Sequence, residues 1–265
     1  MNEINLIWIF LIFIIIGLIS ALSGTGGGAL KVPLLMFFGY IISAVSISIF
    51  TNLFLSIPTT IINIKRKAIE YKISLFIIIG SFCGTFLGNL VYNFLILTNF
   101  LIYIIIFTLF IIFTSIRLLL SKSDFDTPSY KEKKILLNFK NGILAGLIGF
   151  GAGISSTLFG LGGGLVVTPL LVVLLNSNVH KAISTSIFVM NFTAFFGVVE
   201  NYFQNYYTIE IIFVVIIVGS GVIIGSLIAS TIFRRAHPKY LKYIFVSIAL
   251  FLAVPLLWVS YFNLI

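Results

Sequence analysis

The stretch GTGGGALKVP, from Gly24 to Pro33, has a related copy 136 positions later, GLGGGLVVTP, from Gly160 to Pro169. Both copies lie inside long apolar tracts, where glycine triplets are not expected. Glycine-rich interruptions that recur in two halves of an apolar chain are typical of a membrane transporter built by duplication. The repeat therefore predicts two related halves, each with a helix broken at its glycine segment.

The composition places the chain in a membrane. Hydrophobic residues make up 60% of the 265 residues and charged residues only 9%. Apolar tracts of about 20 residues, the length that spans a bilayer as a helix, recur along the whole chain. A water-soluble protein of this composition would expose too much apolar surface. We predict an all-α, polytopic helical protein of the cell membrane that has the lipid bilayer as its main partner.

Eight spans are predicted from these tracts: Leu6–Leu22, Ile41–Ile62, Ile73–Leu95, Phe100–Leu120, Gly142–Phe159, Val179–Val199, Ile209–Phe233 and Tyr243–Phe262. Each glycine segment is followed by a further, short apolar stretch, at Val32–Phe38 and Val166–Leu175. The first span is expected to be retained with its N-terminus outside, because its leading charge, Glu3, is acidic rather than basic.

The polar stretch at residues 121–141 divides the chain into a first repeat (1–120), a cytoplasmic linker and a second repeat (142–265). The repeat extends beyond the glycines, because Ala44–Phe50 resembles Ala182–Phe188 in order and in register. The same spacing of small residues also occurs in both halves, in Gly84-x-x-x-Gly88 and Gly221-x-x-x-Gly225. Such spacing allows helix backbones to approach closely in lipid.

Positive charges decide the orientation of the halves. If the glycine segments re-enter without crossing, the halves are parallel, and the charges at Lys181 and in the Arg234–Lys242 cluster fall outside. If each segment crosses as a broken helix, there are five crossings per half and the second half is inverted. Every Lys and Arg except Lys31, which lies within a crossing, then falls on the inside, as the positive-inside rule requires. The charges therefore favour inverted halves.

The sequence gives little support for nucleic-acid binding, metal or cofactor binding, or enzymatic activity. The net charge of +9 lies in short loops beside the spans, which suits anionic headgroups rather than nucleic acid. Cys83 is the only cysteine, and His180 and His237 are far apart in sequence, so no metal site and no cofactor are expected. The chain has no H-E-x-x-H, no Gly-x-Ser-x-Gly and no carboxylate pair within a span, so no enzyme is indicated.

The glycine segments are predicted to bind an anion. An unwound backbone is tolerated at membrane depth only where it is buried in protein or lines a wet cavity. The free N–H groups at the start of each following helix, together with the helix dipole, attract negative charge. Pro33 and Pro169 are expected to fix the helix breaks, within or near the first turns of the short helices, where a missing N–H costs least. The alternative is that the glycines serve only close helix packing.

Polar residues near the segments complete the predicted site. Lys31 either has a role in binding, which would be confined to the first half because its counterpart is Val167, or extends to a lipid headgroup. Serine, threonine and asparagine on the next span line the pathway or bond neighbouring helices. The predicted substrate-binding residues are Gly26, Gly27, Gly28, Lys31, Pro33, Ser48, Asn52, Gly162, Gly163, Gly164, Pro169, Thr185, Ser186 and Asn191. Carboxylates are missing from the span centres, which favours an anionic substrate, and Glu200 is the best site for a coupling proton or ion.

With these motifs in place, the chain resembles the sulfite exporter TauE/SafE family, also called the toluene-sulfonate uptake permease family. The resemblance rests on the doubled Gly-x-Gly-Gly-Gly…Pro motif, on Ala44 to Ser48, and on His180 to Ser186. It implies an inner-membrane permease or exporter of small sulfur-containing oxyanions such as sulfite or organosulfonates. An anion channel, or a membrane enzyme or assembly factor whose glycines only pack, remain the alternatives.

Overall fold

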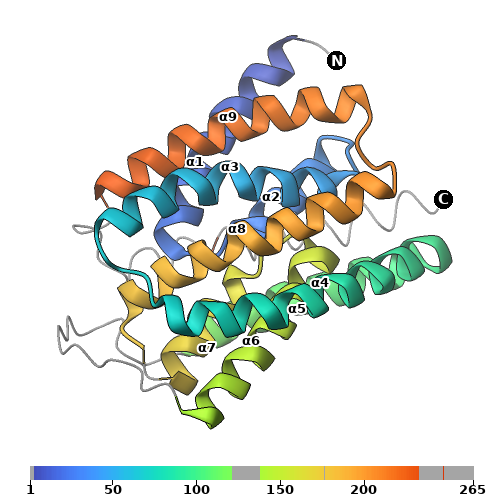
Figure 1. Cartoon of the computed structure of the whole chain (residues 1–265). Helices are drawn as coiled ribbons and strands as arrows, with labels where there is room; N and C mark the ends of the chain where they lie inside the picture. The colour runs from blue at the N-terminus through green and yellow to red at the C-terminus, as the bar shows by residue number, and fades with distance from the viewer. Residues whose placement is uncertain (1–2, 121–137, 176, 233–246, 248–265) are drawn as a thin grey trace.

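A computed structural model describes residues 3–120, 138–175, 177–232 and Ser247, and within these ranges the chain is helical (Figure 1). The helices are α1 (Glu3–Ser23), α2 (Gly28–Phe37), α3 (Ala44–Lys65), α4 (Tyr71–Thr98), α5 (Phe100–Leu120), α6 (Phe139–Phe159), α7 (Gly164–Leu175), α8 (Val179–Phe203) and α9 (Ile209–Ile232). The all-helical prediction is therefore confirmed. The predicted span Tyr243–Phe262, His237, the Arg234–Lys242 cluster and most of the linker lie outside the described residues.

Five of these helices are long and apolar enough to cross a membrane: Ala44–Lys65, Tyr71–Ile96, Phe139–Phe159, Val179–Phe203 and Ile209–Thr231. Shorter apolar helices occupy Ile7–Ser23, Gly28–Phe37, Phe100–Phe113 and Gly164–Leu175. The chain is thus a multi-pass membrane protein.

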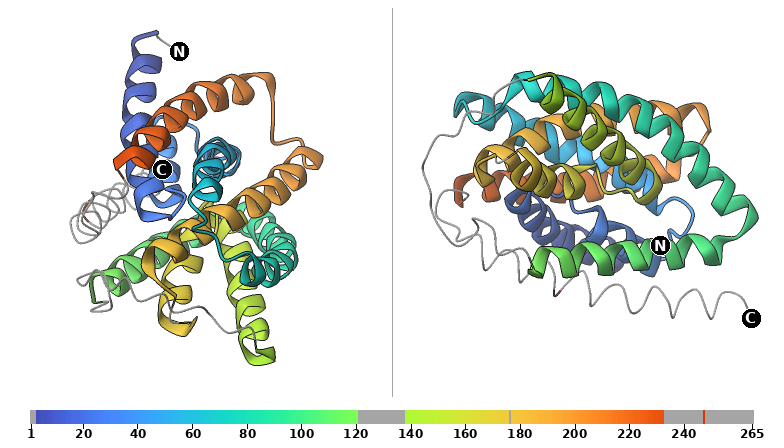
Figure 2. Two further views of the ribbon diagram at one scale, coloured as in Figure 1. Left: turned by 60° about the vertical axis from the view of Figure 1, so that its left-hand side comes forward. Right: turned by 90° about the horizontal axis from the view of Figure 1, so that it is seen from below.

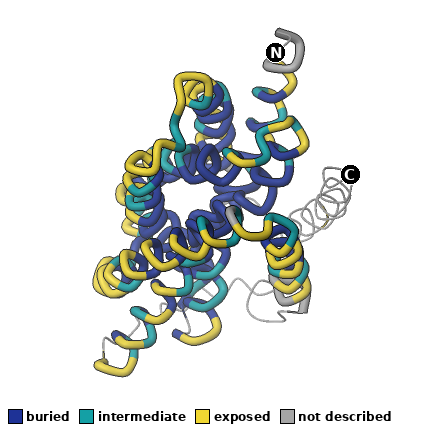
Figure 3. Tube along the Cα trace, turned by 90° about the vertical axis from the view of Figure 1, so that its right-hand side faces the viewer, coloured by how far each residue is buried: buried dark blue, intermediate teal, exposed yellow. Residues whose placement is uncertain are grey.

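The molecule is apolar outside, and its interior combines an apolar core with buried polar side chains. Large apolar side chains such as Trp8, Leu75 and Phe86 are exposed on the outer helices, where lipid would cover them. The buried stretches lie in the middle of the bundle (Figure 3), and they include polar side chains of α3 and α8 such as Asn52 and Ser186. A polar interior among membrane helices has to be hydrogen-bonded, and this makes it the place to look for function.

Helices α3 and α8 pack against each other and run in opposite directions. The hydroxyl of Tyr207, just after α8, donates to the carbonyl of Ser46 near the start of α3, at 3.2 Å. The backbone N–H of Glu70, just after α3, donates to Thr185 Oγ1 near the start of α8, at 3.1 Å. Because α3 and α8 carry the matching sequence stretches, their antiparallel course is the one that inverted halves predict.

The outer helices pack across the two halves, α1 along α9 and α4 along α6 (Figure 2). Both contacts are backbone-close, as the glycine spacing predicts. A Cβ on Gly225 would lie 2.0 Å from the carbonyl oxygen of Ile14, and one on Gly84 would lie 2.1 Å from that of Phe150. Each of these contacts joins a helix of the first half to a helix of the second, so the halves interlock.

The chain returns through α2 to the end of the molecule where α1 began. Helix α9 starts beside the beginning of α3, because Tyr207, just before α9, bonds Ser46 of α3. Helix α1 runs parallel to α9, because Gly221 faces Phe10 and Gly225 faces Ile14. Helices α1 and α3 therefore run in the same direction, and α2 connects them in the reverse direction. With ten residues, α2 is about 15 Å long, or half the hydrocarbon thickness. This path matches the crossing arrangement, not the re-entrant one.

Labelling from the two sides of the membrane tests this arrangement. In a C83A background, cysteine at Lys67, in the α3–α4 loop, should react with an impermeant maleimide only after the inner side is opened. Cysteine at Asn205, the matching position in the α8–α9 loop, should react in intact cells. Both residues have positive φ, 51° and 59°, so the two variants are matched in backbone conformation. Labelling of both cysteines from the same side would contradict inverted halves.

Candidate functional site

The two glycine segments, Gly24–Gly28 and Gly160–Gly164, break the chain in the same way. Backbone φ is +68°, +77° and +72° at Gly24, Gly26 and Gly27, and +67°, +69° and +76° at Gly160, Gly162 and Gly163. These left-handed values favour glycine strongly over other residues. The glycines therefore end α1 and α6 and allow α2 and α7 to begin at Gly28 and Gly164.

The two prolines lie in the second turn of their helices. Pro33 and Pro169 are each the sixth residue of their helix, counted from Gly28 and Gly164. They do not set the helix breaks, because the left-handed glycines already do so. A proline at this depth removes the N–H that would otherwise bond the carbonyl four residues earlier, in Ala29 or Leu165. Their contribution is thus a freed carbonyl in the first turn of α2 and of α7.

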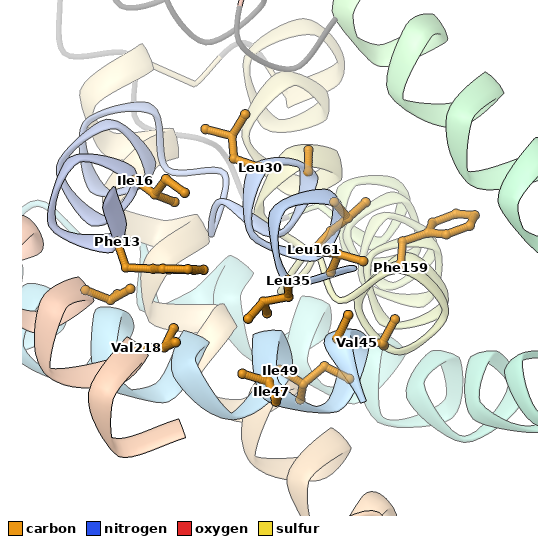
Figure 4. Close-up of a cluster of buried hydrophobic side chains, with 14 of the residues drawn as sticks. Phe13, Ile16, Leu30, Leu35, Val45, Ile47, Ile49, Phe159, Leu161 and Val218 are labelled. Carbon is orange, nitrogen blue, oxygen red and sulfur yellow. The ribbon is translucent and has the colours of Figure 1, made fainter. Parts of the chain in front are cut away.

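The two segments contact each other reciprocally. A Cβ on Gly28 would lie 2.1 Å from the carbonyl oxygen of Gly160, and one on Gly164 would lie 2.2 Å from that of Gly24. All ten residues of the two segments are buried. In Figure 4, Leu161 lies among Leu35 of α2 and Val45 of α3, in one apolar cluster. The starts of α2 and α7 therefore meet inside the bundle.

Hydroxyl and amide groups from both halves hold the segments in place. Ser48 Oγ and Asn52 Nδ2 of α3 donate to the carbonyl of Gly160, at 2.8 and 3.2 Å. Ser186 Oγ of α8 donates to the carbonyl of Gly24 at 3.0 Å. Ser48 and Ser186 occupy the same place in the sequence repeat, and each bonds the first glycine of the opposite half. Sequence alone identified both serines but could not show which carbonyl each one bonds.

Lys31 lies in this cluster and does not reach the surface. Its side chain is fully buried, so the alternative that it extends to a lipid headgroup does not describe this structure. Its ammonium donates to the carbonyl of Ser48 at 3.4 Å, to Thr51 Oγ1 at 3.3 Å and to Asn52 Oδ1. All three acceptors are neutral oxygens on α3.

Two predicted site residues lie elsewhere. Thr185 accepts the backbone N–H of Glu70 at one end of α8. Asn191 accepts a hydrogen bond from Ser56 and donates to Thr60, both on α3. These two side chains join α8 to neighbouring elements and make no described hydrogen bond to a glycine segment. Polarity and helical spacing do not show which face of α8 a residue occupies, so the sequence alone does not place Thr185 and Asn191.

Three residues at the segments were not among the predicted site residues. Thr168 Oγ1 donates to the carbonyl of Gly24 at 3.4 Å, and Thr193 Oγ1 donates to that of Gly162 at 3.2 Å. The methyl group of Met190 would lie 2.9 Å from a Cβ on Gly26 and 2.8 Å from one on Gly164. The sequence could have indicated Thr168, because it lies directly before Pro169 in the second glycine motif. Met190 carried none, because an apolar residue in an apolar span does not stand out.

Several buried hydroxyls have no hydrogen-bond partner within the described residues, and four of them, all serines, form two corresponding pairs. Ser20 and Ser156 each lie four residues before a glycine segment, and Ser46 and Ser184 match each other in the α3 and α8 repeat. Ser20 Oγ lies against the start of α2, where a Cβ on Gly27 would stand only 1.8 Å away. Buried hydroxyls are normally hydrogen-bonded, so unpartnered ones beside a helix start point to a polar ligand.

The electrostatics at the segments favour negative charge. The first N–H groups of α2 and α7 have no carbonyl of their own helix to bond, and the helix dipoles make both starts positive. Glu200 lies in the last turn of α8, where it hydrogen-bonds Asn89, and Glu70 lies next to α4. Neither carboxylate makes a described hydrogen bond to a glycine segment. Partial burial raises the pKa of Glu70, and nearby Lys181 opposes that shift. No metal-binding group of three His, Cys, Asp or Glu occurs in the part of the chain that the structure covers.

Comparison with known proteins decides the family. The family described as "Sulfite exporter TauE/SafE" matches residues 9–256. The chain belongs to the TauE/SafE family. This TauE/SafE chain is 31% identical over 255 residues to the "Probable membrane transporter protein MJ0441" of Methanocaldococcus jannaschii, covering 88% of each. It is 24% identical over 288 residues to the "Probable membrane transporter protein YunE" of Bacillus subtilis, covering 96% of this chain and 99% of the relative. No solved structure matches it.

The TauE/SafE family is a family of membrane transporters, and the multi-pass architecture agrees with this. The resemblance expected from the doubled glycine motif is therefore confirmed. Transport rather than enzymatic catalysis is the activity that the family name describes.

Proposed function

We propose that this protein is a secondary transporter of a small, sulfur-containing oxyanion such as sulfite or an organosulfonate. The observation that carries the proposal is the reciprocal meeting of the starts of α2 and α7 inside the bundle. Two helix starts that face one buried place offer their N–H groups and their dipoles to one anion. The buried hydroxyl of Ser20 supplies a neutral donor beside the start of α2. The sulfur chemistry of the substrate is supported by the family name alone.

Access to this site requires movement. Both glycine segments are buried and in contact, so an anion reaches them only when the helix starts separate. The contacts to be broken are the hydrogen bonds from Ser48 to Gly160 and from Ser186 to Gly24. Because the outer helices pack across the halves, we propose that α1 moves together with α9 and α4 together with α6. Opening alternately towards the two ends of α3 and α8 would carry the anion across the membrane.

Uptake into proteoliposomes tests the proposal. Purified protein should accumulate one or more of sulfite, thiosulfate, sulfonates and carboxylates down an imposed gradient, and unlabelled anion inside should accelerate uptake. G163L should abolish this uptake, because Gly163 has φ +76° and sits at the start of α7. G39L is the matched control, since Gly39 also has positive φ, +93°, but a Cβ at this position would have no other atom within 4 Å.

Three outcomes distinguish the alternatives. Flux that internal anion does not accelerate would indicate a channel instead of a carrier. Flux that G163L leaves intact would show that the glycines only pack. An absence of flux for every anion would overturn the proposed function and leave a membrane enzyme or assembly factor as the alternative.

A further inference from the structure

Lys31 buries an amino group inside the transporter, and the three acceptors around it match the three N–H bonds of an ammonium. The side chain is fully buried, and its three acceptors, on Ser48, Thr51 and Asn52, carry no charge. Among the described residues, no carboxylate forms an ion pair with it. The remaining acidic residues of the chain lie near the N-terminus or in the polar linker. A buried charge is normally paired, because removing it from water is costly.

The ammonium lies next to the place where the glycine segments meet. Asn52 accepts a hydrogen bond from Lys31 through Oδ1 and donates to the carbonyl of Gly160 through Nδ2. Ser48 links the same two groups, since its carbonyl accepts from Lys31 while its hydroxyl donates to Gly160. Lys31 is thus one side chain away from the contact between Gly28 and Gly160. An anion between the helix starts would lie within its field, in surroundings that screen charge weakly.

Lys31 is present in one half only. Its counterpart, Val167, is apolar and buried, so the site has one lysine rather than two. The dipoles of α2 and α7 attract anions but add no net charge, because each helix has an equal and opposite charge at its other end. The net charge of the loaded site is therefore set by Lys31 and by the substrate.

We propose that Lys31 is the counter-charge of the substrate and that it makes the transporter selective for oxyanions with a single negative charge. This inference rests on the proposed function and specifies its substrate class. With a monoanion such as a sulfonate, the loaded site is neutral and can be enclosed away from water. A dianion such as sulfate or thiosulfate leaves one negative charge uncompensated in the membrane interior, and this is penalised.

Binding measurements on the purified full-length protein test the proposal. The affinities for methanesulfonate and for sulfate are measured by isothermal titration calorimetry at constant ionic strength. The wild-type protein should bind methanesulfonate at least tenfold more tightly than sulfate. K31M, which keeps the length of the side chain but not its charge, should reduce the methanesulfonate-to-sulfate ratio at least tenfold. K31R should keep the ratio. K140M is the control for lost surface charge, because Lys140 is exposed on α6, and it should leave the ratio unchanged.

The outcomes separate this inference from the proposed function. Wild-type protein that binds sulfate as well as or better than methanesulfonate overturns the inference. So does K31M that binds both anions with an unchanged ratio, because a merely structural lysine would weaken both equally. If K31M does not fold, the wild-type ratio together with that of K31R decides. Wild-type protein that binds no anion overturns the proposed function itself.

Discussion

Replacing Gly28 with alanine is expected to reduce anion uptake at least tenfold and to destabilise the protein by about 3 kcal/mol or more. Gly28 is helical, so alanine there brings no backbone strain and should even favour the helix. The loss comes from contact alone, because the new Cβ would stand 2.1 Å from the carbonyl oxygen of Gly160. That neighbour is backbone, and it cannot move without shifting the second glycine segment.

The same reasoning applies to Gly164, whose Cβ would meet the carbonyl oxygen of Gly24 at 2.2 Å. G28A and G164A should therefore have similar effects on uptake and on the melting temperature in detergent. G151A is the matched control, since Gly151 is also helical but its nearest neighbour, Val166 Cγ1, lies 3.9 Å away. It should leave both measurements unchanged. Full uptake by G28A would show that the segments do not meet in the working protein.

Replacing Asn52 with leucine is expected to lower the melting temperature by roughly 5–10 °C. The leucine leaves the buried ammonium of Lys31 without its contact to Oδ1, and it removes one of the two α3 donors to Gly160. Hydrogen bonds to a buried charge contribute about 1.5–3 kcal/mol, more than bonds between neutral groups. N191L is the control, because Asn191 bonds only the neutral groups of Ser56 and Thr60 and backbone carbonyls of α8. N191L should lower the melting temperature by less than N52L does.

The double variant K31M/N52L shows whether the charge is the cause. If the unsatisfied ammonium dominates the loss, removal of the charge should restore most of the melting temperature, so the two substitutions would be strongly non-additive. Anion binding should stay impaired, since Lys31 is absent. Additive losses in the double variant would show that Asn52 acts mainly through Gly160.

The broad architecture could be predicted from the sequence because its causes are local. Length and apolarity predicted the spans, and the repeated glycines predicted breaks at the positions where left-handed backbone is found. The orientation followed from lysine and arginine, which lie in loops and obey the insertion bias. The antiparallel course of α3 and α8 agrees with that orientation. Duplication of the halves is supported by the matching φ values and contacts and stays a prediction.

The site could be predicted only in part, because contacts between distant segments leave little trace in a single chain. Gly28, Ser48 and Ser186 were identified through the repeat, but the crossing of their hydrogen bonds between halves was not. Lys31 could not be placed, since a lysine near a helix break has two physically reasonable positions. Met190 was missed because apolar spans contain many such residues.

The interlocking of the outer helices has a consequence for fragments of this protein. The glycine-lined face of α4 is covered by α6, and the matching face of α9 is covered by α1. A fragment that ends before residue 138 contains α4 without α6, and one that starts at residue 138 contains α9 without α1. Each fragment would therefore expose a glycine-lined helix face to the lipid. Neither piece contains the helix that fits it. Each fragment expressed alone should be degraded, and only co-expression of the two fragments should give stable protein.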